Sequence, residues 1–207
     1  MAGSQQEIYL IGKSMLTGSL AYNQESLFLL RLNTDGQVFW QKAFSFGHTA
    51  IHPKQVLFHN GKLLITGHLI QPEDNNTKSY STKWFALQYK LQDESTQSIS
   101  IPGKAYYGHA QGTIVTDNGY ISLLNDANYF GQTVLLSMNE ALEITGSQEL
   151  LGTLMLCSGL MQQGEQLLIG SVFSNSFKDY SPGYILYHPG TQHVLAKSSP
   201  TLFRHFL

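Results

Sequence analysis

Short apolar runs separated by glycine-containing turns recur along the whole chain. In the first clear example, Leu27 to Leu32 is followed by Asn33-Thr34-Asp35-Gly36 and then by a second run, Gln37 to Phe44. Asp-Gly between two apolar runs is a strong hairpin signal, because glycine adopts a positive φ without a steric penalty. The runs are too short for helices and are bounded by glycine, so we expect β-strands joined by tight turns.

The combination of a glycine-containing turn and an apolar strand is repeated. It occurs at Asn60-Gly61, at Asn118-Gly119 and at Gln163-Gly164, and Glu7 to Gly12 resembles the same strand without its turn. In each copy two further strands follow. The repeat therefore divides the chain into four units of strands, at 7–44, 55–101, 112–149 and 159–197.

Units of this length fit the four-stranded blades of a β-propeller. We expect an all-β chain forming a single domain, 1–207, with about four blades of four antiparallel strands. The first unit begins at its second strand, and the segment 201–207 (TLFRHFL) stands where a first strand would follow. We therefore predict that this C-terminal strand closes the first blade, which removes an exposed sheet edge. A longer propeller, or two copies that join, are the alternatives.

Several positions carry a resemblance to known repeats. They are Leu32, Gly36, Trp40, Lys42, Phe46-Gly47, Asn60-Gly61 and Gly67. In this pattern the chain resembles bacterial β-propeller repeat proteins with quinoprotein-like and kelch-like four-stranded blades. The later units depart from it, since Ile99, Gln148 and Ala196 stand near the place of Trp40. The resemblance implies four-stranded blades and a non-catalytic module at a cell surface or in secretion.

Composition excludes several function classes. Charged residues make up 13% of the chain and the formal net charge is −2, with lysine and arginine scattered, which argues against a nucleic-acid partner held through phosphates. No apolar run is long enough to span a membrane, and residues 1–20 lack the pattern of a secretory signal. The compartment stays open, although a polar but uncharged surface favours a secreted, cell-surface or particle-associated protein.

Cys157 is the single cysteine, so the chain has no intrachain disulfide and no zinc site built on several thiolates. It stands in an apolar run, LGTLMLCSGL, which predicts a buried, inert thiol. We expect no cofactor and no metal.

The longer connections between strands are where binding residues concentrate. A tyrosine precedes the third strand of each unit, at Tyr22, Tyr80, Tyr129 and Tyr180. Four tyrosines in equivalent loops would form a ring that can stack on sugars or anchor a protein. Aromatic packing between neighbouring blades is the alternative interpretation.

Histidines form a second repeat, because Phe46-Gly47-His48 and Tyr107-Gly108-His109 both lead into a first strand. We take His48 and His109 as candidate contacts to a partner. Together with His52 they could also ligate a metal, but no acidic residue repeats beside them, so satisfied or solvated histidines are the expectation.

Carboxylates give no catalytic pattern. Glycoside hydrolysis needs two carboxylates about 5 to 10 Å apart. The acidic residues of the expected loops, Glu25, Glu73, Asp74, Asp126 and Asp179, form no repeated pair. The sequence therefore favours a non-catalytic binding or scaffolding module that recognises a protein partner or larger assembly through its long-loop face. A glycan-binding lectin and a propeller glycoside hydrolase are the alternatives.

Overall fold

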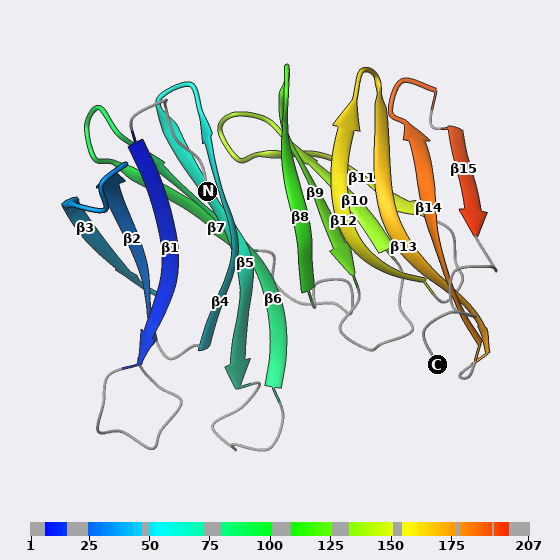
Figure 1. The fold of residues 1–207 in the computed structure, drawn as a ribbon, viewed down its shortest axis with the longest axis horizontal. Helices are drawn as coiled ribbons and strands as arrows, with labels where there is room; N and C mark the ends of the chain where they lie inside the picture. The colour runs from blue at the N-terminus through cyan, green and yellow to red at the C-terminus, as the bar shows by residue number, and fades with distance from the viewer. Residues whose placement is uncertain are drawn as a thin grey trace. The chain divides into compact units, whose positions relative to one another are not determined.

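The computed structural model of the chain is all-β, as the sequence predicts. The structure describes residues 7–15, 25–46, 50–72, 80–100, 109–125, 133–150, 155–176, 179–191 and 193–198, and these residues contain strands and turns but no helix. The strands form four antiparallel sheets (Figure 1). The predicted closing strand, 201–207, lies outside the described residues.

The four sheets, here named A to D in chain order, are simple meanders in which consecutive strands are neighbours. Sheet A contains β1 (Glu7–Met15), β2 (Glu25–Asn33) and β3 (Val38–Ser45). Sheet B contains β4 (Ala50–His59), β5 (Lys62–Pro72), β6 (Tyr80–Lys90) and β7 (Thr96–Ser100). Sheet C contains β8 (His109–Thr116), β9 (Gly119–Asn125), β10 (Thr133–Met138) and β11 (Ile144–Leu150). Sheet D contains β12 (Met155–Gln163), β13 (Gln166–Ser176), β14 (Asp179–His188) and β15 (His193–Ser198).

The chain divides into two compact units, each holding two sheets. Unit 1 covers Met1–Gly103 and holds sheets A and B, and unit 2 covers Lys104–Leu207 and holds sheets C and D. Each unit has its own hydrophobic core between its two sheets.

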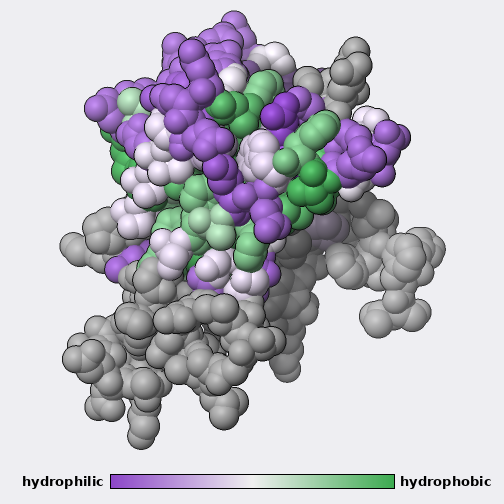
Figure 2. All heavy atoms as spheres, turned by 90° about the vertical axis from the view of Figure 1, so that its left-hand side faces the viewer, coloured by the Kyte–Doolittle hydropathy of each residue, from purple (hydrophilic) through white to green (hydrophobic). Residues whose placement is uncertain are grey.

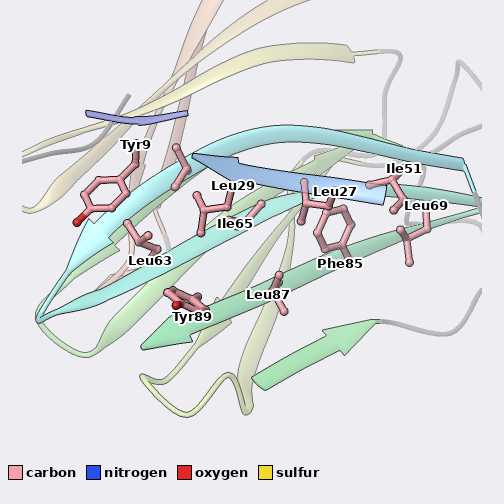
Figure 3. Close-up of a cluster of buried hydrophobic side chains, with 11 residues drawn as sticks. Tyr9, Leu27, Leu29, Ile51, Leu63, Ile65, Leu69, Phe85, Leu87 and Tyr89 are labelled. Carbon is pink, nitrogen blue, oxygen red and sulfur yellow. The ribbon is translucent and has the colours of Figure 1, made fainter. Parts of the chain in front are cut away.

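The core of unit 1 is rich in aromatic side chains. From sheet A it takes Tyr9, Leu27 and Leu29, and from sheet B it takes Ile51, Val56, Leu63, Ile65, Leu69, Phe85, Leu87 and Tyr89 (Figure 3). Trp40 lies beside this cluster, with its ring 5.6 Å from that of Tyr89 and 6.3 Å from that of Tyr9. Aromatic pairs at such separations add to the energy of area burial.

The core of unit 2 is mainly aliphatic. Its buried members are Leu123, Leu135, Leu150, Cys157, Leu167, Ile169, Ile185 and Tyr187. Cys157 is buried here, as its apolar run predicts.

The turn after β2 and the turn after β10 are built in the same way. The side-chain oxygen of Asn33 accepts hydrogen bonds from the backbone N–H of Asp35 and Gln37 at 3.0 and 2.8 Å. The side-chain oxygen of Asn139 accepts the corresponding bonds from Ala141 and Glu143, both at 2.9 Å. An asparagine side chain thus replaces a backbone acceptor in sheets A and C, which shows the repeat at the level of single atoms.

Strands extend further than the apolar runs that revealed them. Tyr80 begins β6, where it is opposite Pro72, and Tyr180 lies within β14 opposite Ser174. Both were expected in loops. Ladder hydrogen bonds are made by the backbone, so pairing continues past the last apolar side chain until the chain diverges.

Candidate functional site

The six residues that the sequence singles out fall into two groups. Tyr22, His48 and Tyr129 lie outside the described residues. Tyr80 and Tyr180 lie near the starts of β6 and β14, and His109 is the first residue of β8. Tyr80 follows the long connection 73–79, but Tyr180 follows only 177–178 and pairs with Ser174. The tyrosine ring stays a prediction.

His52, the third histidine of the possible metal group, lies in β4, and its neighbour is a histidine outside that group. Its ring stacks on that of His68 in β5, with centroids 4.7 Å apart and planes inclined by 4°. The two residues are directly opposite in the β4–β5 ladder. Among the residues that the structure describes, no three histidine, cysteine or acidic side chains lie close enough to hold a metal ion.

Glu25 is the acidic candidate whose surroundings are best defined, and they are structural. It begins β2 and is 8% exposed. Its carboxylate accepts a hydrogen bond from the backbone N–H of Ile51 at 2.7 Å and lies 3.1 Å from the ammonium of Lys13. Because Ile51 belongs to β4, the carboxylate joins sheet A to sheet B.

In unit 2 a hydrogen bond between uncharged groups, here called the neutral bridge, joins sheet C to sheet D. The side-chain amide of Asn125 donates to the backbone carbonyl of Cys157 at 2.9 Å, and the Asn125 oxygen accepts from the Thr133 hydroxyl at 3.2 Å. The Cys157 thiol lies 3.5 Å from that hydroxyl and 3.8 Å from the hydroxyl of Ser171. Burial raises the pKa of the Cys157 thiol, which keeps it protonated and a poor nucleophile.

The remaining well-defined carboxylate, Glu7, is bound at the other end of sheet A. It forms an ion pair with the Arg31 guanidinium and accepts a hydrogen bond from the Tyr9 hydroxyl at 2.7 Å. The hydrogen bond from Arg31, followed by that from Tyr9, lowers the pKa of Glu7. Burial, followed by the bond to Glu7, raises the pKa of Tyr9 to about 12.

Sheet A also presents an apolar surface, on the face turned away from sheet B. This outer face of sheet A includes Ile8, Leu10, Gly12, Phe28, Leu30 and Leu32, which alternate along β1 and β2 with the residues of the core. On β3 the residues opposite Leu30 and Phe28 are Gln41 and Ala43. Figure 2 views the molecule from the side where β1 to β3 lie, and green hydrophobic atoms are visible there between purple hydrophilic ones. Its residues include Leu10, whose side chain is 37% exposed.

Comparison with known proteins adds no family. No protein-family model and no curated protein matches the chain. No helix of the described residues is long and apolar enough to cross a membrane. The resemblance to bacterial propeller repeats therefore stays an expectation drawn from the sequence.

Proposed function

We propose that the chain is a non-catalytic β-propeller module that binds a macromolecular partner, a protein or a larger assembly, through its longer connections. One observation carries this proposal. The connections from β1 to β2, from β5 to β6 and from β9 to β10 are 16–24, 73–79 and 126–132, whereas β4–β5 and β8–β9 are joined by the tight turns 60–61 and 117–118. In sheet D the equivalent connection, from β13 to β14, is only 177–178. A rigid sheet that presents its long segments at one end is a common arrangement for binding.

The described acidic side chains support binding over catalysis. Glu25 connects two sheets, and Glu7 is paired with Arg31. Glu94 pairs with Lys42 at 2.6 Å, and Asp93 accepts hydrogen bonds from Ser95 within its own turn. Each of these groups is used to hold the backbone or another element.

The propeller part of the proposal assigns 201–207 as the strand that sheet A lacks. Sheet A has three strands, while the other sheets have four. In the part of the chain that the structure describes, β1 pairs with β2 alone, whereas its counterparts β5, β9 and β13 pair on both sides. An added strand would satisfy the backbone groups on the free edge of β1.

Deletion of 201–207 tests this assignment. We expect the amide hydrogens of β1 that point away from β2 to exchange slowly in the full chain and at least tenfold faster in the truncated chain, while β9 amides stay unchanged. Equal exchange in β1 of both chains would contradict the assignment.

Loop variants test the binding proposal. Tyr22→Ala with Tyr129→Ala alters two of the long connections, and Asp117→Asn with Glu165→Gln alters two tight turns as a matched control. We expect a partner captured by quantitative cross-linking to be retained by the control and lost by the tyrosine variant. Equal capture by both variants would exclude the long connections as the binding region.

The tyrosine repeat also favours a second candidate function, a lectin. Tyr80 begins β6 directly after the long connection 73–79, whereas Tyr180 lies in β14, which only 177–178 separates from β13. Binding on a glycan array that is lost in the same tyrosine variant, with no protein captured, would support the lectin instead of the protein-binding module.

A further inference from the structure

Along β1 and β2, the outer face of sheet A carries a pattern of cross-strand apolar pairs, ending in a Gly–Phe pair, that matches in register a face that sheet B buries. In sheet A the cross-strand pairs are Ile8 with Leu32, Leu10 with Leu30 and Gly12 with Phe28. In sheet B the corresponding pairs are Leu63 with Tyr89, Ile65 with Leu87 and Gly67 with Phe85. Leu32, Leu30 and Phe28 stand one, three and five positions before the end of β2. Tyr89, Leu87 and Phe85 stand at the same positions before the end of β6.

The two equivalent faces differ in what covers them. In sheet B this face packs on sheet A, and Ile65 and Phe85 are both 0% exposed. In sheet A, the equivalent Leu10 is 37% exposed. A Cβ atom built on Gly12 would meet no atom within 4 Å, so there is room above this residue. Among the described residues of unit 1, sheet B packs on the other face of sheet A, so the outer face of sheet A has the composition of a sheet-packing surface without a partner sheet in its unit.

Sheet D also has an outer face with exposed apolar residues, and it corresponds to the face with which sheet A packs on sheet B. Its core-facing residues Ile185 and Tyr187 stand three and one positions before the end of β14, as Leu87 and Tyr89 do in β6. The outer face of sheet D contains the residues between and beside them, which are Met161, Leu168, Tyr184, Leu186 and Leu195. Tyr184 stands four positions before the end of β14, as Leu29 does before the end of β2. Leu29 lies on the face of sheet A that packs on sheet B.

Exposed apolar side chains gather on these two sheets. The large hydrophobic residues that are most exposed in the described part of the chain are Leu10, Val38 and Phe39 of sheet A, Met161, Tyr184 and Leu195 of sheet D, and Phe58 and Ile144. Apolar sheet faces left open in this way mark interaction sites.

We propose that the outer face of sheet A binds a second copy of this chain, whose sheet D packs on it by its outer face. The contact repeats the packing that already joins the sheets of unit 1, in which two different faces meet. Such a head-to-tail contact is heterologous, and it closes into a ring when the same contact forms again between the other two ends.

This inference rests on the proposed propeller, and it adds which chain supplies the neighbour of sheet A. The exchange experiment on β1 tests the added strand, and the oligomeric state tests the second copy, so the two proposals can fail separately.

Two glutamate variants test the second copy, one on each face. Leu10→Glu places a charge on the outer face of sheet A, and Leu168→Glu places one on the outer face of sheet D. Ile144→Glu is the matched control, because Ile144 is 48% exposed and belongs to sheet C. By sedimentation, we expect twice the mass of the chain for the wild type and the control, and a dissociation constant raised about 30-fold or more for each face variant.

Mixing the two face variants gives the sharpest result. The Leu10→Glu chain keeps a normal sheet D, and the Leu168→Glu chain keeps a normal sheet A, so one contact can still form between them. We expect a heterodimer in the mixture, although each variant alone sediments as a monomer. The milder Leu10→Ser and Leu168→Ser, checked by circular dichroism, repeat the test if a glutamate variant does not fold.

Three results would overturn the proposal. A wild-type monomer would show that the outer face of sheet A is covered within one chain. A dimer that survives Leu168→Glu but not Leu10→Glu would show that two copies of sheet A meet each other. Polymers of increasing length would show that the contact does not close into a ring of two.

Discussion

The two units connect their sheets at equivalent places with different chemistry. In unit 1 the carboxylate of Glu25 accepts the Ile51 N–H and has the Lys13 ammonium beside it. In unit 2 the amide of Asn125 donates to the carbonyl of Cys157. Both bridges end on the backbone of the first strand of the following sheet. In both units a polar side chain connects the two sheets there, as an acceptor in unit 1 and as a donor in unit 2.

The cores differ as well. In unit 1, Tyr9, Trp40, Phe44 and Tyr89 make ring-to-ring contacts with one another, and Phe46 packs on Phe85. In unit 2, Tyr187 is the aromatic residue among the buried members of the described core. Unit 1 therefore combines a charged bridge with an aromatic core, and unit 2 combines a neutral bridge with an aliphatic core. We expect the units to respond differently to substitution, pH and salt.

The largest effect is expected from Gly67→Ala in unit 1. A Cβ atom on Gly67 would lie 2.3 Å from the carbonyl oxygen of His52 and 2.8 Å from the ring of Phe85. Overpacking of this kind should cost about 3 kcal/mol in the free energy of unfolding by urea. Hydrogen exchange should show the loss in β5 and β6.

Gly12→Ala is the matched control, because Gly12 has the same place in sheet A and a Cβ there meets nothing within 4 Å. It should leave stability unchanged or raise it by about 0.5 kcal/mol. Equal losses for both glycines would show that the close approach at Gly67 does not form.

Removal of the two bridges should have the next largest effect. Glu25→Leu leaves the buried Ile51 N–H without its acceptor, and Asn125→Leu leaves the Cys157 carbonyl without its donor. Each should cost about 1 to 3 kcal/mol, measured by urea unfolding, because an unsatisfied buried group loses its solvation.

The effect of salt on stability should distinguish the Glu25 bridge from the Asn125 bridge. The loss from Glu25→Leu should become smaller in concentrated salt, since part of it comes from the ion pair with Lys13. Glu25→Gln keeps an oxygen for Ile51 and should show no such salt dependence. A salt dependence in Asn125→Leu would contradict the assignment of a neutral bridge to unit 2.

Alkaline pH should lower the free energy of unfolding of both units, and the loss should begin at a different pH in each. Because the folded state raises the pKa of Tyr9 from 10.0 to about 12, its contribution is complete below pH 10 and is lost as the pH rises through 12. The pKa of Cys157 is raised from 9.0 by burial, so the loss in unit 2 begins near pH 9. Urea unfolding between pH 8 and 11 measures both, and Tyr9→Phe should remove the contribution of Tyr9 alone.

The smallest effect is expected from Lys42→Gln. Lys42 donates to Glu94 at 2.6 Å on the surface of unit 1, and this bond raises the pKa of the lysine. An exposed ion pair contributes little after solvent screening, so the melting temperature should not change measurably. A clear fall would show that this contact, and not only the Glu25 bridge, holds sheets A and B together.

The turns at Gly61 and Gly164 could be predicted from the sequence, whereas the backbone conformation of the glycine-free turn after β10 could not. Gly61 and Gly164 adopt φ of 70° and 60°, as their turn sequences require. The turn after β10 instead places Leu142 at a φ of 57°, in a segment without glycine. The Asn139 side chain provides the acceptor that makes this conformation stable, and nothing local in NEALE indicates that a leucine will adopt it.

The two hydrogen bonds that connect the sheets could not be predicted from the sequence either. Glu25 reaches Ile51, 26 positions away, and Asn125 reaches Cys157, 32 positions away. Alternation of apolar residues identifies a strand and its buried face, but it does not give the position of one sheet over the next. Glu25 was therefore grouped with loop carboxylates, although it begins β2 and is engaged between two sheets.

The asparagine-built turn occurs in sheets A and C, the first sheet of each unit. In sheet B the corresponding turn uses the Asp93 carboxylate, which accepts from Ser95, and in sheet D it contains Pro189-Gly190. The asparagine-built turn therefore recurs once in each unit of about one hundred residues, at every second sheet of the chain.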